Sequence, residues 1–300
     1  MNVQPRFTGT YVALATPFLP DGNFDETAYR RLIDHVIDGG VEGLVPMGTT
    51  GENPTMKNDE HQRAIALAVE AARGRVRVIA GSGSNDTDQA ILMTRFARSA
   101  GAEASLSVTP YYNKPTQEGL VRHFSTIAEK ADLPVVIYNV PGRTGSSLAP
   151  ETLGRLLADP RIVAVKDATA NLEQTMGYLR AARSAGRADF SLLSGDDALT
   201  LPMISIGAHG VISVVANEAP RAMSDMVRAA LAGDFARARE LHYRLLDLMQ
   251  ANFLESNPIP VKYALSRMGL MGETYRLPLC EMSAANKQKM DRILAALDLV

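Results

Sequence analysis

The chain has 300 residues, of which 46% are hydrophobic and 21% are charged, and its formal net charge is −2. This composition is typical of a soluble globular protein, and without a basic cluster neither nucleic acid nor an anionic membrane is an expected partner. The single cysteine, Cys280, cannot form an intrachain disulfide, and no apolar run is long enough for a signal segment or a membrane span, so we expect a cytoplasmic protein.

Short apolar runs, each typical of a buried strand, alternate with longer segments. The predicted strands are Tyr11–Phe18, Gly43–Gly48, Val76–Ser84, Ala104–Pro110, Pro134–Val140, Ile162–Thr169, Phe190–Asp197 and Gly210–Asn217. Helices between them include Asp25–Asp38, Asn58–Arg73 and Thr116–Lys130, where apolar residues recur at helical spacing. After Asn217 only helices are predicted, at Ala219–Leu231, Asp234–Ala251, Pro258–Met268 and Ser283–Leu299.

Eight strand–helix units in this order predict an α/β fold, a (β/α)8 TIM barrel. We expect residues 1–232 to form the catalytic barrel and residues 233–300 to form a C-terminal helical extension packed on it. The alternative is a doubly wound open sheet. Such a sheet normally has a glycine-rich phosphate turn after its first strand, and residues 15–25 (ATPFLPDGNFD) are not one.

Polar residues follow several of the predicted strands. They are Thr49 and Thr50 after the second strand, Tyr111 and Tyr112 after the fourth, Tyr138 near the end of the fifth with Arg143 after it, Lys166 in the sixth and Gly195–Asp197 at the end of the seventh. Each taken alone could be a turn or a packing residue. Because the carboxyl ends of barrel strands carry the chemistry in such folds, their recurrence predicts one site at that end.

Lys166 follows four apolar residues and shares their strand, where alternation places it on the same face as Ile162 and Ala164. It could be a solvated lysine at the end of a strand. If it is buried instead, desolvation lowers its pKa from about 10.4 towards about 7, and the free amine can condense with a ketone to form a Schiff base.

Other groups at the same end fit such chemistry. Tyr138 and Thr49 have hydroxyls that can move protons, and Thr50 with the backbone N–H groups of Gly48–Gly51 can hold a carboxylate. The five histidines show no metal-binding spacing, so we expect neither a metal nor another cofactor.

Six motifs carry a resemblance to a known family. They are GTTGE (48–52), VTPYYNKPTQEG (108–119), YNVPGRTG (138–145), VKDAT (165–169), LLSGDD (192–197) and HGVISV (209–214). In this order and spacing they resemble the dihydrodipicolinate synthase family. This family belongs to the pyruvate-dependent class I aldolases, which also include N-acetylneuraminate lyase, and the resemblance covers nearly the whole chain.

The resemblance implies the activity of a 4-hydroxy-tetrahydrodipicolinate synthase in lysine and diaminopimelate biosynthesis. Pyruvate would form a Schiff base on Lys166, and the enamine would add to L-aspartate 4-semialdehyde before cyclisation and release. Tyr138, Thr49 and Tyr112 would relay protons, with Tyr112 reaching in from a neighbouring subunit of a homotetramer built from dimers. Four residues would contact substrate: Thr50 the pyruvate carboxylate, Arg143 the aldehyde substrate's carboxylate, and Gly195 and Ile212 the pocket wall.

The chain departs from the family pattern near a regulatory region. After GTTGE it reads NPTMKND (53–59), whereas the family pattern has a small residue at position 53 and often a histidine at position 58. In addition, Gln89 stands where lysine-inhibited relatives have glutamate. We therefore expect weak or absent feedback inhibition by lysine.

Two other functions stay open at this point. One is a sister enzyme that uses the same Schiff base, such as a sugar-acid aldolase, an N-acetylneuraminate-type lyase or a keto-deoxy sugar acid dehydratase. The other is a catalytically inactive barrel used for binding or regulation. GTTGE (48–52) followed by PYYNKP (110–115) and Arg143 together favour the synthase. Intact Lys166, Tyr138 and Arg143 disfavour an inactive barrel.

Overall fold

The computed structural model describes residues 4–300, and the eight strands in these residues form one closed parallel barrel in chain order. The strands are β1 (Gly9–Ala13), β2 (Gly43–Val45), β3 (Arg77–Gly81), β4 (Ala104–Val108), β5 (Val135–Asn139), β6 (Ile162–Asp167), β7 (Ser191–Ser194) and β8 (Gly210–Ser213). Nearly all of their residues are buried, which explains the continuous apolar runs in the sequence. The predicted (β/α)8 barrel is confirmed, and the open-sheet alternative is wrong.

Helices and 3-10 turns occupy the connections between strands. They are α1 (Glu26–Asp38), η1 (Thr49–Gly51), η2 (Asn53–Thr55), α2 (Asn58–Ala72), α3 (Thr87–Ser99), α4 (Gln117–Ala131), α5 (Pro141–Thr144), α6 (Pro150–Leu156), α7 (Leu172–Ser184) and α8 (Thr200–Ser205). After β8 follow η3 (Val215–Asn217), α9 (Pro220–Leu231), α10 (Phe235–Ala251), α11 (Ile259–Arg267) and α12 (Ala284–Ala296). The four helices predicted after Asn217 are therefore confirmed to within a few residues.

Local sequence explains why α1 begins and ends where it does. The Asp25 side chain accepts a hydrogen bond from the Ala28 N–H, 2.9 Å away, and so caps the first turn. Tyr29 and Leu32 lie on the buried face. The helix ends at Asp38, and Gly40 follows with φ +86°, a conformation that favours glycine.

The first and last strands are shorter than predicted. The first was expected at Tyr11–Phe18, but β1 ends at Ala13, and Phe18 instead forms an isolated antiparallel bridge with Phe24. The eighth was expected to reach Asn217, but β8 ends at Ser213 and η3 follows. The residues beyond both strand ends are as buried as the strands, so apolar composition does not mark where the ladder stops.

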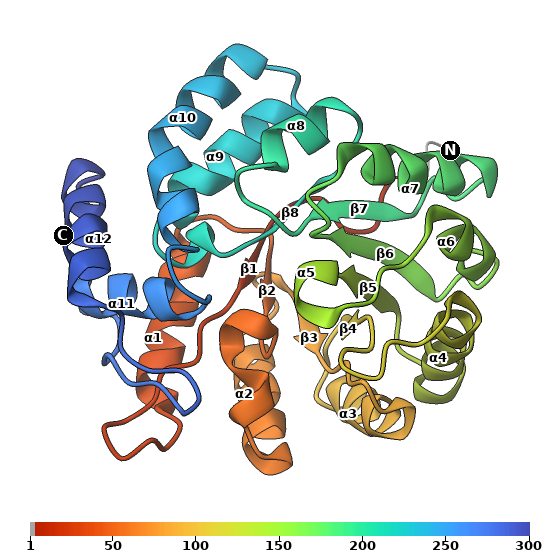
Figure 1. The fold of residues 1–300 in the computed structure, drawn as a ribbon, viewed down its shortest axis with the longest axis horizontal. Helices are drawn as coiled ribbons and strands as arrows, with labels where there is room; N and C mark the ends of the chain where they lie inside the picture. The colour runs from red at the N-terminus through yellow and green to blue at the C-terminus, as the bar shows by residue number, and fades with distance from the viewer. Residues whose placement is uncertain (1–3) are drawn as a thin grey trace. The chain divides into compact units, whose positions relative to one another are not determined.

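Close packing groups the chain into two units. The first contains residues 4–9 and Ile79–Ile212, and within it β4–β7 pair in register, for example Ser105 with Val135 and Tyr138 with Lys166. Helices α3, α4, α6 and α7 pack against one another in chain order along the outside of these strands, as Figure 1 shows.

The second unit contains residues Thr10–Val78 and Ser213–Val300. Here Tyr11 pairs with Gly43, and Gly43 pairs with Arg77. Helix α1 contacts α2 and α9, α9 contacts α10, and α12 contacts α10 and α11 (Figure 1). The division into a barrel of residues 1–232 and an extension of residues 233–300 stays a prediction. No helix in residues 4–300 is long and apolar enough to cross a membrane.

Candidate active site

Lys166 lies inside the fold. It is the fifth residue of β6, pairs in register with Tyr138 on β5 and Leu193 on β7, and is only 6% exposed. The interpretation of Lys166 as a solvated surface residue is therefore wrong.

Burial changes the acidity of this lysine. Desolvation is the main cause that lowers the pKa of Lys166 from 10.5 to about 8, and the positive charge of Arg143 lowers it further, whereas the negative charge of Asp197 opposes the shift. The pKa of Lys166 is lowered, as the sequence predicts, but to about 8 rather than to about 7. Near neutral pH, part of the protein population therefore carries Lys166 as a free amine, the form that attacks a carbonyl.

The Tyr138 ring packs directly against this amine. The Lys166 Nζ lies 4.2 Å from the centroid of the ring, and Tyr138 is itself only 7% exposed. The aromatic ring stabilises the ammonium form through its quadrupole and excludes water from one side of it. These two residues, one from β5 and one from β6, form the centre of the candidate site.

Gly195, directly after β7, packs closely against Lys166. A β-carbon at this position would lie 2.8 Å from Ala168 Cβ and 3.1 Å from Lys166 Cε. The Gly195 N–H donates to the Asp167 carbonyl over 2.7 Å, which fixes this close approach. A side chain at position 195 would therefore force Ala168 and Lys166 to shift.

Asp167 organises the end of β6. Its Oδ2 accepts a hydrogen bond from Thr175 Oγ1 over 2.6 Å, and its Oδ1 accepts from the Thr169 N–H over 3.0 Å. The loop after the strand is thereby tied to α7, which keeps the end of the lysine's strand rigid.

Arg143 stands on the short helix α5 and is exposed. Its loop is held at both ends. Asn139 Oδ1 accepts from the Leu148 N–H over 3.0 Å, and Ser146 Oγ donates to the Pro110 carbonyl over 2.8 Å. The second bond links the Arg143 loop to the segment that leads into Tyr111 and Tyr112.

Tyr112 does not point into the described protein. Its side chain is 90% exposed, and its backbone has φ +68°, in the left-handed region that a tyrosine rarely adopts. Such a conformation costs free energy of order 1–3 kcal/mol and persists only where the surroundings hold it.

Thr49 and Thr50 belong to the second unit, in the 3-10 turn η1 that follows β2. Thr50 is 2% exposed, and its Oγ1 accepts a hydrogen bond from Asn257 Nδ2 over 3.0 Å. Ile212, the last of the predicted site residues, is the third residue of β8 and is 1% exposed.

The sequence placed Asp197 among the residues at the strand ends but gave it no role. In the structure Asp197 is 3% exposed, and its negative charge raises the pKa of Lys166. Asn257 was not assigned to the site, because it lies 207 residues from Thr50 and no local pattern connects the two. Within residues 4–300 no cluster of three histidine, cysteine, aspartate or glutamate side chains has the arrangement of a metal site.

Comparisons with known proteins identify the family of the chain. The model of the dihydrodipicolinate synthetase family matches residues 6–297. The 4-hydroxy-tetrahydrodipicolinate synthase of Nitratidesulfovibrio vulgaris (strain DP4) is 51% identical over 292 residues, which cover 97% of this chain and 98% of that protein.

Solved structures give the same result. The crystal structure of dihydrodipicolinate synthase from Aquifex aeolicus matches with a TM-score of 0.94 and 46% identity, covering 98% of this chain and 99% of that one. A structure described as the first monomeric dihydrodipicolinate synthase variant matches with a TM-score of 0.96 and 40% identity, covering 98% of both chains. The resemblance expected from the six motifs is thus confirmed, and the chain belongs to the dihydrodipicolinate synthetase family.

Proposed function

We propose that this protein is a 4-hydroxy-tetrahydrodipicolinate synthase that condenses pyruvate with L-aspartate 4-semialdehyde. The observation that carries the proposal is Lys166, a buried lysine with a pKa of about 8 against the Tyr138 ring. Family membership and the names of close relatives support the same activity.

The chemistry begins at the Lys166 amine. Its lone pair attacks the ketone carbon of pyruvate, the resulting carbinolamine loses water, and a protonated imine remains. Loss of a proton from the pyruvyl methyl group gives an enamine, whose carbon forms a bond to the aldehyde carbon of the semialdehyde while the aldehyde oxygen takes up a proton. The amino group of the added substrate then attacks the imine carbon, which closes the ring and releases the Lys166 amine.

The other residues have roles that follow from their groups. Tyr138, Thr49 and Tyr112 relay the protons, Thr50 donates a hydrogen bond to the pyruvate carboxylate, and Arg143 binds the carboxylate of the aldehyde substrate. Gly195 and Ile212 line the pocket. The exposure and flexible stem of Arg143 suit a group that meets the second substrate after the Schiff base has formed.

The protein acts as a homo-oligomer, a tetramer built from dimers, in the cytoplasm. The support for assembly is Tyr112, because an exposed aromatic residue in a costly backbone conformation fits a partner's site better than solvent. That a related synthase is described as a monomeric variant fits an oligomeric family.

A two-substrate assay tests the proposal. Pyruvate and L-aspartate 4-semialdehyde should both be consumed. Arg143→Ala should lower kcat/KM for the semialdehyde by roughly one to two decades, while trapping of pyruvate at a pH well above the Lys166 pKa stays within about twofold. Trapping without turnover of the semialdehyde would indicate a sister aldolase or lyase. Absence of both would indicate an inactive barrel.

A further inference from the structure

The turn that carries Thr50 is held by residues from the last fifth of the chain. Asn257 lies just before α11, is 6% exposed, and donates from Nδ2 to the Thr50 Oγ1 over 3.0 Å. Both partners are buried, so water does not compete for this bond.

The direction of this hydrogen bond sets what Thr50 can do. A threonine hydroxyl has one hydrogen and two lone pairs, and the Asn257 amide occupies a lone pair. The hydroxyl hydrogen is therefore directed to another acceptor. A carboxylate is acceptor-only, so it needs a hydroxyl that is kept as a donor.

A buried ion pair fixes the same turn two residues further along. Glu52 has φ +54°, is 2% exposed, and its carboxylate pairs with the Nζ of Lys262 on α11. Lys262 is fully buried, and its Nζ lies 4.2 Å from the centroid of the Phe18 ring. Because separating such a pair would leave an uncompensated buried charge, the turn and α11 keep one relative position.

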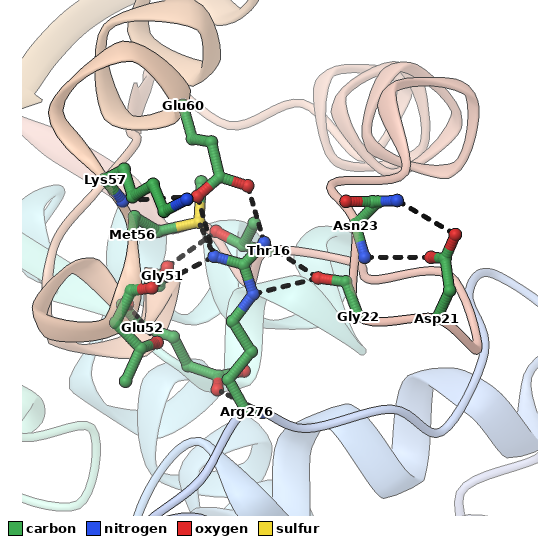
Figure 2. Close-up of polar contacts among 11 residues, drawn as sticks. Thr16, Asp21, Gly22, Asn23, Gly51, Glu52, Met56, Lys57, Glu60 and Arg276 are labelled. Carbon is green, nitrogen blue, oxygen red and sulfur yellow. Dashed lines mark hydrogen bonds and ion pairs between the residues drawn. The ribbon is translucent and has the colours of Figure 1, made fainter.

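Arg276 holds the segment that follows the turn. Figure 2 shows its guanidinium between the Gly22 carbonyl and the Glu60 carboxylate. Its Nη1 also donates to the Thr55 carbonyl over 3.0 Å. Thr16 Oγ1 donates to the Gly51 carbonyl over 2.7 Å (Figure 2). The backbone of the turn is thus held by several side chains, which leaves Asn257 to set the Thr50 hydroxyl.

We propose that Asn257 is a positioning residue for the carboxylate of the ketone substrate, because it holds Thr50 as a hydrogen-bond donor. The inference rests on the proposed function, in which Thr50 binds the carboxylate of pyruvate. It gives the C-terminal segment around α11 a part in substrate binding.

Borohydride trapping at varied pyruvate concentration measures the effect in the full-length protein. Asn257→Ala should raise the half-saturating pyruvate concentration roughly five- to thirtyfold, whereas the maximal trapping rate stays within about twofold. Asn257→Asp keeps the shape of the side chain but accepts a hydrogen bond from Thr50, so it should raise that concentration at least as much. The half-saturating concentration of L-aspartate 4-semialdehyde in turnover should not change in either variant.

Asn286→Ala is the matched control. Asn286, on α12 of the same C-terminal segment, also donates its side-chain amide, but to Glu255 over 2.8 Å. This variant should bind pyruvate like the wild-type protein. A similar loss of pyruvate affinity in Asn286→Ala would contradict a specific role for Asn257.

A double-mutant cycle with Thr50→Val decides whether Asn257 acts through Thr50. The inference predicts that Asn257→Ala causes no further loss of pyruvate affinity once the Thr50 hydroxyl is absent. Independent, multiplicative losses would overturn it, as would equal changes in maximal rate and in both half-saturating concentrations. Failure of the proposed function looks different, because the wild-type protein would then trap no pyruvate at all.

Discussion

Gly195 and Lys166 lie so close together that a β-carbon at position 195 would come within 3.1 Å of Lys166 Cε. The same β-carbon would meet Ala168 Cβ and the Asp167 carbonyl, which the rigid end of β6 holds in place. The absence of a side chain on Gly195, directly after β7, is therefore what allows Lys166 its position.

Gly195→Ala should slow trapping of pyruvate by roughly tenfold or more, because overpacking of this kind costs about 1–3 kcal/mol and moves the amine. Gly154→Ala is the control, since a β-carbon on that residue of α6 would have its nearest neighbour, Ala181 Cβ, 3.9 Å away. Trapping rates measured with both variants check this, and equal rates would show that the contact does not matter.

The pH dependence of trapping should report the pKa of Lys166. At subsaturating pyruvate the rate should rise with pH, reach half its maximum near pH 8 and fall about tenfold per unit below that, because only the free amine reacts. Asp197→Asn removes a charge that raises this pKa and should move the midpoint down, whereas Arg143→Ala should move it up. Shifts in the same direction for both variants would contradict the electrostatic account.

Much of the fold followed from local patterns. The run from Ile162 to Val165 predicted a strand buried on both faces, and β6 is such a strand. Asp25 before an amphipathic stretch predicted the start of α1, and Gly39–Gly40 predicted its end. A lysine near the end of an apolar strand indicated a functional residue, because burying an ammonium is costly. In the structure Lys166 is buried.

The rest depends on contacts between distant segments, which no local pattern contains. The bond from Asn257 to Thr50 and the ion pair from Lys262 to Glu52 each join residues more than 200 positions apart. Strand ends were also misplaced, because Val215 beyond β8 is as buried as the strand itself. The short helix α5, which carries Arg143, spans only four residues and is too short for a periodic signal.

Tyr112→Phe should lower turnover by roughly tenfold or more, because it removes a proposed proton carrier, and should leave the oligomer intact. Tyr243→Phe, at another exposed tyrosine on α10, is the control and should keep full turnover. An activity assay measures turnover in both variants, and light scattering measures their oligomeric state. A monomer that is fully active at assay concentration would contradict the assignment of Tyr112 to a partner's site.

Lysine should inhibit weakly or not at all. Gln89 on α3 offers the ammonium of a bound lysine a neutral carbonyl, and charge-assisted hydrogen bonds are about twice as strong as neutral ones. Gln89→Glu should therefore strengthen inhibition roughly five- to thirtyfold, whereas Gln288→Glu, the same charge change on exposed α12, should not. Titration of L-lysine into the assay measures this. Half-inhibition of the unaltered protein at submillimolar lysine would contradict the expected weak binding.

The most direct test of Lys166 as the Schiff-base residue is reduction with borohydride in the presence of pyruvate, followed by tryptic peptide mapping. Modification of Lys166 blocks cleavage after it, so the account predicts a peptide of residues 162–180 that carries one reduced pyruvyl group in place of the unmodified peptide of residues 162–166. Lys166→Ala should abolish labelling, and Lys130→Ala, at an exposed lysine of α4, should leave it unchanged. Labelling on another lysine, or labelling that persists in Lys166→Ala, would contradict the account.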